Sequence, residues 1–232
     1  MDEQPQLPLD DRQDTAQVFR PRANLFYRGF LIVLPVFLLT VGYVWYKVYR
    51  SPYRTGVLVP VGQPVLFSHR HHAGDLKLDC RYCHTSVERS SFAGLPPTQT
   101  CMTCHSQIFT DSALLRPVLD SYTSGRPIRW NRVHNLPDYV YFNHAIHVNK
   151  GVGCSTCHGQ VNEMPLVWKT QTLFMEWCLS CHRHPEANLR PIKEIFNLSW
   201  KPSKTQPLAG AQLAKDYHLD TPHLTNCSVC HH

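Results

Sequence analysis

One short pattern, Cys-x-x-Cys-His, occurs five times in this chain of 232 residues and accounts for all ten of its cysteines. Two thiols three residues apart can reach the two vinyl groups of a porphyrin, and the histidine that follows then lies beneath the iron as a proximal ligand. The pattern therefore predicts five covalently bound c-type haems and an electron-carrying chain. The predicted thioether cysteines are Cys80, Cys83, Cys101, Cys104, Cys154, Cys157, Cys178, Cys181, Cys227 and Cys230, and the predicted proximal ligands are His84, His105, His158, His182 and His231.

Two other interpretations of the cysteines have less support. Ten cysteines could form disulfides in a secreted protein, and paired Cys-x-x-Cys motifs also bind zinc. Neither alternative explains why a histidine follows every one of the five pairs with no cysteine left over. The repetition of the spacing favours haem attachment.

The number of haems constrains the fold class. Residues 65–232 provide about 34 residues for each motif, too few to build an ordinary core around each haem. We expect the porphyrins to supply the core, with a mostly irregular chain and short α-helices wrapped around them and little β structure. The formal charge of +6 would balance the haem propionates, which argues against nucleic-acid binding.

Residues 29–46 carry no charge and are mostly large and apolar, with Arg28 before them and Lys47 and Arg50 after them. About 20 such residues in a helix cross the hydrocarbon core of a bilayer. We therefore predict a transmembrane helix over residues 29–48. A cleaved signal peptide is the alternative, but the stretch is long, follows 28 residues and shows no small-residue cleavage site.

The orientation of this span follows from chemistry, because c-type haem is attached outside the cytoplasm. Basic residues on both sides make the positive-inside rule uninformative here. We expect a single-pass protein of the cytoplasmic (inner) membrane, with residues 1–28 as a cytoplasmic tail, residues 49–64 as a linker and the haem region in the periplasm.

The haem region contains an internal repeat. Phe67, His69 and His72 precede two motifs, and Phe142, His144 and His147 precede the next two, with corresponding positions offset by about 75 residues. This pattern predicts a first diheme module at residues 65–110, a spacer at 111–132, a second diheme module at 133–200 and a C-terminal segment at 201–232 with the fifth haem.

The repeated Phe-x-His-x-x-His element predicts distal iron ligands. Two histidines three residues apart lie on one side of a helical turn and can serve two different irons. The predicted distal ligands are His69, His72, His144 and His147, although His71 could exchange roles with His72. The fifth distal ligand is open between His134 and His218, which we favour, and His223, Met164 and Met175.

The segment beginning Phe67-Ser-His-Arg-His-His-Ala-Gly and running through Cys80-Arg-Tyr-Cys-His resembles the cytochrome c3/c7-type multihaem superfamily. The anchor, the five motifs, Arg132-Val-His-Asn-Leu-Pro-Asp and Phe174-Met-Glu-Trp-Cys together resemble the pentahaem membrane-anchored cytochrome subunits of alternative complex III. That resemblance implies a subunit of a respiratory or photosynthetic quinol-oxidising complex with an iron–sulfur subunit, polytopic quinol-binding subunits and a monohaem cytochrome. Electrons would leave to a soluble cytochrome c, a blue copper protein or a terminal oxidase.

An electron-transfer subunit of this kind has no catalytic residues and no substrate site of its own. Two enzymatic alternatives are a stand-alone anchored multihaem quinol dehydrogenase and a multihaem reductase of the nitrite type. The first places a haem close to the membrane, whereas Cys80 lies more than thirty residues beyond Tyr46. The second requires an open iron position, and the chain has 15 histidines, ten beyond the five proximal ones.

Overall fold

The computed structural model describes residues 19, 20 and 22–231. Most of the predicted N-terminal tail, residues 1–28, therefore lies outside the described residues. The chain divides after Tyr49 into two compact units.

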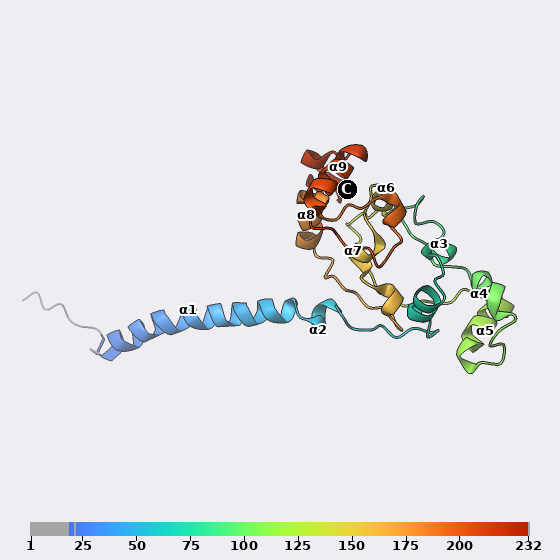
Figure 1. Ribbon diagram of the computed structural model, residues 1–232. Helices are drawn as coiled ribbons and strands as arrows, with labels where there is room; N and C mark the ends of the chain where they lie inside the picture. The colour runs from blue at the N-terminus through green and yellow to red at the C-terminus, as the bar shows by residue number, and fades with distance from the viewer. Residues whose placement is uncertain (1–18, 21, 232) are drawn as a thin grey trace, which may run out of the picture. The chain divides into compact units, whose positions relative to one another are not determined.

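The first unit contains one long helix, α1, over Arg22–Tyr49 (Figure 1). It begins before the predicted start at residue 29, because residues such as Leu25 and Arg28 are good helix formers and extend the helix beyond the apolar stretch. No residue of α1 is buried, and most of its side chains are apolar. A helix of 28 residues is about 42 Å long, enough to cross a bilayer once as a single-pass anchor.

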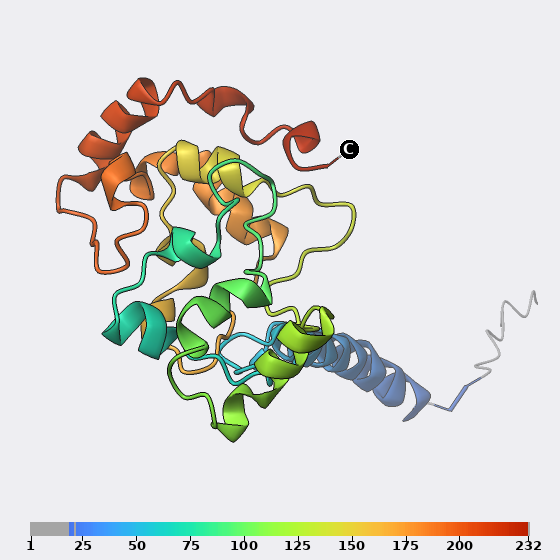
Figure 2. The ribbon, with the colours of Figure 1, turned by 90° about the vertical axis from the view of Figure 1, so that its right-hand side faces the viewer.

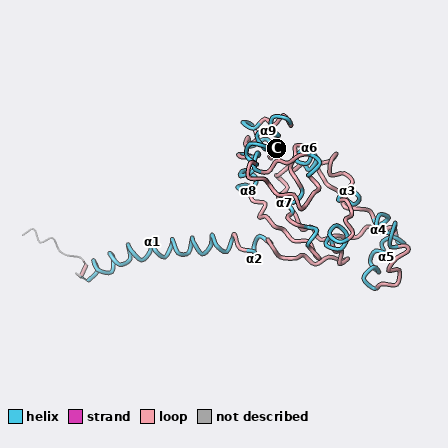
Figure 3. The backbone as a smooth tube through the Cα atoms, in the orientation of Figure 1, coloured by secondary structure: helices cyan, strands magenta, loops and turns pink. Residues whose placement is uncertain are grey.

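The second unit begins at Arg50 and consists of short helices joined by long loops (Figures 2 and 3). Its described residues form no strand and only two isolated bridges, Val57 with Lys169 and Val152 with Leu189. The predicted architecture, an apolar N-terminal helix followed by a mostly irregular region with short helices, is confirmed. The α-helices are α2 (Pro52–Thr55), α3 (Cys80–Cys83), α4 (Thr98–His105), α5 (Arg116–Ser124), α6 (His144–Asn149), α7 (Cys154–His158), α8 (Met175–Arg183) and α9 (Gln206–Asp216).

Shorter helical turns connect these elements. A π-helical turn, η1 (Arg70–Asp75), follows His69, and the 3-10 turns are η2 (Ala113–Leu115), η3 (Val161–Glu163), η4 (Pro185–Ala187), η5 (Ile192–Glu194), η6 (Thr221–His223) and η7 (Cys227–Val229).

Few apolar side chains are fully buried in the part of the chain that the structure describes. One cluster joins Val87 of the first repeat to Val148 and Ile195 of the second, with Phe196 packed against it. The buried apolar residues are Val65, Val87, Val118, Val148, Met164, Leu189, Ile195 and Leu198. Chains of this length ordinarily bury a larger apolar core, so the set is the one expected where large prosthetic groups supply much of the interior.

Contacts between the two repeats fasten them into one unit. The backbone N–H groups of His144 and Ala145 donate to the carbonyls of Ser91 and Ser90, at 3.1 Å each. In the other direction, the N–H of Arg70 donates to the carbonyl of Met164 at 3.0 Å. The start of the second histidine pair is thus held by the first repeat, and the first pair is held by the second repeat.

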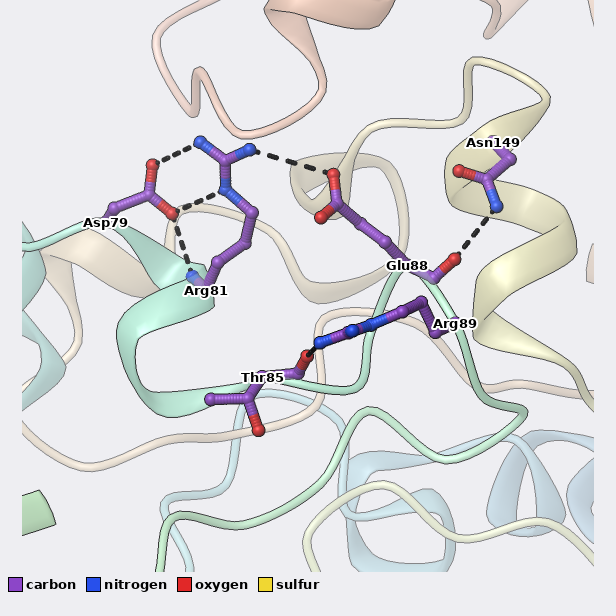
Figure 4. Close-up of polar contacts among 6 residues, drawn as sticks. All are labelled: Asp79, Arg81, Thr85, Glu88, Arg89 and Asn149. Carbon is purple, nitrogen blue, oxygen red and sulfur yellow. Dashed lines mark hydrogen bonds and ion pairs between the residues drawn. The ribbon is translucent and has the colours of Figure 1, made fainter.

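A polar network reinforces this connection beside the first motif (Figure 4). The Asp79 carboxylate caps α3 by accepting from the N–H of Arg81, and it pairs with the Arg81 guanidinium at 2.8 Å. Arg81 also lies 3.7 Å from Glu88, whose carbonyl accepts from the Asn149 amide at 2.9 Å. The network therefore runs from the first motif to the C-terminal end of α6.

Candidate haem sites

Each Cys-x-x-Cys-His motif is built on a single helical turn. In the first motif, the N–H of His84 donates to the carbonyl of Cys80 at 2.8 Å, and in the fifth His231 donates to Cys227 at 2.9 Å. Residues three apart in such a turn share one face, so the two thiols project together. None of the ten cysteines forms a disulfide. The motifs thus present paired thiols followed at once by an imidazole.

Four of the five motif histidines face one of the four predicted distal histidines. The ring centres lie between 6.1 and 6.5 Å apart in every pair. The pairs are His69 with His84 (6.5 Å, planes at 5°), His72 with His105 (6.3 Å, 62°), His144 with His158 (6.3 Å, 11°) and His147 with His182 (6.1 Å, 37°).

These separations fit one metal ion between two imidazoles. An imidazole nitrogen binds a transition metal at about 2.0–2.1 Å and lies about 1.1 Å from its ring centre, so two rings on opposite sides of one metal have centres about 6.3 Å apart. Rings in direct van der Waals stacking would lie much closer together. The donor set and its spacing therefore suit a six-coordinate haem iron at each of the four pairs.

The hydrogen bonds of the rings leave the second nitrogen free for a metal. In four motif histidines Nδ1 faces a backbone carbonyl, and a metal-bound imidazole characteristically donates its other N–H to such an acceptor. The same holds for three predicted distal ligands. The Nδ1–carbonyl contacts are His84 to Gly94 (2.8 Å), His105 to Ile108 (3.3 Å), His182 to Leu224 (2.8 Å), His231 to Tyr139 (3.0 Å), His72 to Ser68 (2.9 Å), His144 to Ser91 (2.9 Å) and His147 to Asn143 (2.8 Å).

The internal repeat of the sequence is also a repeat of geometry. The Phe67 ring stacks on His72 at 4.4 Å and meets the edge of His69 at 4.9 Å. In the second copy, Phe142 stacks on His147 at 4.4 Å and meets His144 at 4.7 Å. The phenylalanine therefore sets the relative orientation of both histidines in each copy.

Two of the paired histidines depart from the carbonyl pattern. Nδ1 of His69 is buried without a hydrogen-bond partner, and Nδ1 of His158 lies 3.3 Å from Nε2 of His134. Burial lowers the pKa of His69 to about 4, with the neighbouring His84 contributing, and lowers the pKa of His158 to about 3. Burial, with the charge of Lys169, also lowers the pKa of His134 to about 4. Neutral imidazole is the form that binds metals.

The candidates for the fifth distal ligand are scattered. His134 contacts His158, and His218 follows α9 in a left-handed conformation with φ of 51°. His223 pairs with Asp220 at 2.7 Å. Met164 is 2% exposed and Met175 is 60% exposed.

None of the candidate histidines faces His231 among the described residues. The aromatic ring beside His231 is that of Tyr139, at 5.8 Å. The fifth distal ligand therefore stays a prediction. His71, the possible substitute for His72, instead points its Nδ1 toward Asp75 at 3.6 Å.

Arg190 is a supporting residue that sequence reasoning did not single out. Its side chain is 3% exposed and lies beside α7, where it donates to the Ser155 and Thr156 hydroxyls at 3.2 and 3.1 Å. It also lies over the Trp200 ring at 4.3 Å. A single arginine far from the motif in sequence carries no pattern that predicts this contact.

Comparison with known proteins places the chain in a family. No family model matches the chain. A curated protein from Nitratidesulfovibrio vulgaris, named menaquinone reductase, multiheme cytochrome c subunit, is 32% identical over 174 residues, which are 73% of this chain and 76% of that protein. The shared sequence spans most of both proteins, in agreement with the repeated motifs and the paired histidines. This chain therefore belongs to the family of multihaem cytochrome c subunits that includes the N. vulgaris protein.

Proposed function

We propose that this chain is the electron-transfer subunit of a membrane quinone oxidoreductase and carries five haems c. The observation that carries the proposal is the set of four histidine pairs whose ring centres lie 6.1–6.5 Å apart, each containing one motif histidine. The cysteines of each motif would hold a haem covalently, and the paired histidines would be its axial ligands. When bound, the haems supply reversible one-electron chemistry.

Contacts between motifs support an order for the haems. Four cysteines, Cys83, Cys154, Cys157 and Cys178, each lie close enough to a cysteine of another motif to interact with it electrostatically. The neighbouring thiols are Cys101 beside Cys83, Cys80 beside Cys154, Cys181 beside Cys157 and Cys230 beside Cys178.

From these neighbours we infer a linear order of motifs: second, first, third, fourth and fifth. Two direct contacts agree with it. Tyr82 in the first motif shares a hydrogen bond of 2.7 Å with Thr103 in the second. His182 of the fourth motif contacts the carbonyl of Leu224, just before the fifth motif, at 2.8 Å. The haems starting at Cys101 and Cys227 are therefore the proposed ends of the electron path.

The partners and location of the chain follow from resemblance and chemistry. The resemblance to alternative complex III implies an iron–sulfur subunit, polytopic quinol-binding subunits and a monohaem cytochrome. The relative's name also connects this family with a quinone. We propose that α1 anchors the chain in the cytoplasmic membrane with its N-terminus inside, and that the haem region lies in the periplasm. It would pass electrons from quinol to a soluble cytochrome c, a blue copper protein or a terminal oxidase.

The relative's name favours a second candidate, which is electron flow in the opposite direction. A menaquinone reductase delivers electrons to the quinone. In that case the same five haems would carry electrons from a periplasmic donor toward the membrane. Both candidates require the same haem chain and differ in the direction in which electrons flow along it.

One purification tests these proposals together. The native protein is isolated in mild detergent, its haem is counted, co-purifying chains are identified by mass spectrometry, and quinol oxidation and quinone reduction are assayed. We expect five haems, an iron–sulfur subunit and polytopic subunits, and quinone chemistry in the complex but not in the isolated chain. A chain that purifies alone and oxidises quinol would instead be a stand-alone dehydrogenase.

A further inference from the structure

His158 differs from the other four motif histidines in the partner of its Nδ1 atom. His84, His105, His182 and His231 each place Nδ1 against a backbone carbonyl. Nδ1 of His158 instead faces a side chain, Nε2 of His134, at 3.3 Å, with the two ring centres 4.3 Å apart. The third motif is therefore the one whose outer hydrogen bond can be removed by a single side-chain substitution.

The proton positions follow if His158 binds iron, as the proposed function requires. Opposite His144, the ring of His158 would use Nε2 for the metal, so its Nδ1 must carry the proton. Nε2 of His134 must then accept that proton's hydrogen bond, which leaves the proton of His134 on its own Nδ1.

Contacts of the following residue hold His134 beside the third motif. The amide oxygen of Asn135, its neighbour, accepts from Lys169 Nζ at 3.1 Å. Thr170, which follows Lys169 in the chain, donates its hydroxyl hydrogen to the carbonyl of Cys157 at 3.2 Å. The segment that carries His134 is thus tied to residues that are themselves tied to the third motif.

We propose that His134 is a positioning residue that accepts a hydrogen bond from His158 and lowers the reduction potential of the haem at Cys154 and Cys157. An imidazole nitrogen is a more basic acceptor than a carbonyl oxygen, so it draws the His158 proton more strongly. The ligand then donates more electron density to the iron, which stabilises its oxidised form. This role excludes His134 as a distal ligand, since the nitrogen that would bind iron is already used.

The inference rests on the proposed haem attachment and is tested by His134→Ala and His134→Gln in the full membrane complex, with His184→Ala, at an exposed side chain beside Glu186, as a matched histidine control. Haem content, the spin state by electron paramagnetic resonance (EPR) and an equilibrium redox titration are measured on each. In His134→Ala we expect the haem content and the low-spin EPR signals to be unchanged from the wild type. One transition should move to higher potential, with the oxidised-to-reduced ratio of that haem falling about threefold to tenfold at fixed ambient potential, the worth of one hydrogen bond.

Glutamine offers a neutral oxygen acceptor with similar reach, so His134→Gln should recover part of the shift, and His184→Ala should leave all transitions in place. If the alanine protein does not accumulate, His134→Leu fills the ring volume without an acceptor. Unchanged potentials in the alanine or leucine protein would overturn the inference, as would one haem becoming high-spin, which would make His134 an iron ligand. A wild-type protein without five haems would instead refute the proposed function.

Discussion

Three histidines within four residues give the sharpest test of the axial-ligand assignment. The turn η1 is preceded by His69 and contains His71 and His72, yet the three rings have different environments. His69 and His72 face His84 and His105, whereas His71 is exposed and points toward Asp75. The variants His69→Ala and His72→Ala, with His71→Ala as the internal control, separate these roles.

The expected magnitude follows from one ligand per iron. Each of His69→Ala and His72→Ala should convert one haem in five to high spin, and the double variant should convert two, while all five haems remain attached because the cysteines are untouched. His71→Ala should leave every haem low-spin. Optical spectra of the oxidised protein and a count of bound haem measure these fractions.

The ring planes identify which haem each variant affects. Parallel axial imidazoles split the iron d orbitals strongly and give a rhombic EPR signal, whereas crossed imidazoles compete and give a signal with one large g value. The planes of His69 and His84 lie at 5°, and those of His72 and His105 lie at 62°. We therefore expect His69→Ala to remove a rhombic signal and His72→Ala to weaken the large-g signal.

Two results would refute this reasoning. If His71→Ala produced the high-spin haem and His72→Ala did not, the two neighbours would have the opposite roles. If both His69→Ala and His72→Ala stayed fully low-spin, neither residue would be an iron ligand, and the ring pairs would have a different cause.

Three further predictions concern stability and anchoring. Arg190→Met should lower the free energy of unfolding, measured by denaturant titration, by about 2–4 kcal/mol, because it removes charged hydrogen bonds to Ser155 and Thr156 from a buried site. Arg89→Met, at an exposed site, is the control and should change that free energy by less than about 0.5 kcal/mol. Gly210→Ala would place a methyl group 1.8 Å from the Glu186 carbonyl oxygen, so it should lower the free energy of unfolding by about 1–3 kcal/mol and speed protease cleavage between residues 201 and 232. Gly62→Ala, which has open space around it, should change neither the stability nor the cleavage rate. Replacing residues 1–49 by a cleavable export signal should release the haem region into the soluble fraction with its haems; retention in washed membranes would mean that residues 50–232 or their partners also bind the membrane.

The sequence by itself determined the features that depend on residues close together in the chain. The paired thiols and the histidine of each motif occupy five consecutive residues, so their chemistry is specified before any folding. The apolar stretch around residues 29–46 likewise predicts a helix from composition alone, and the repeat of Phe67-x-His69-x-x-His72 at Phe142 predicts equivalent structures. The apolar pattern does not predict that the helix already begins at Arg22, because helix ends depend on propensity and context.

Only the tertiary structure decided which distant groups meet. The sequence left open whether each histidine pair serves its own repeat, and the fold brings His144 to His158 and His72 to His105, within the same copy, while Ser91 of the first copy supports His144 of the second. Most acceptors that orient the rings are backbone carbonyls, which every residue has and no pattern reveals. The contact of His134 with His158 joins residues 24 positions apart through loops whose paths are set by packing, so it could be found only in three dimensions.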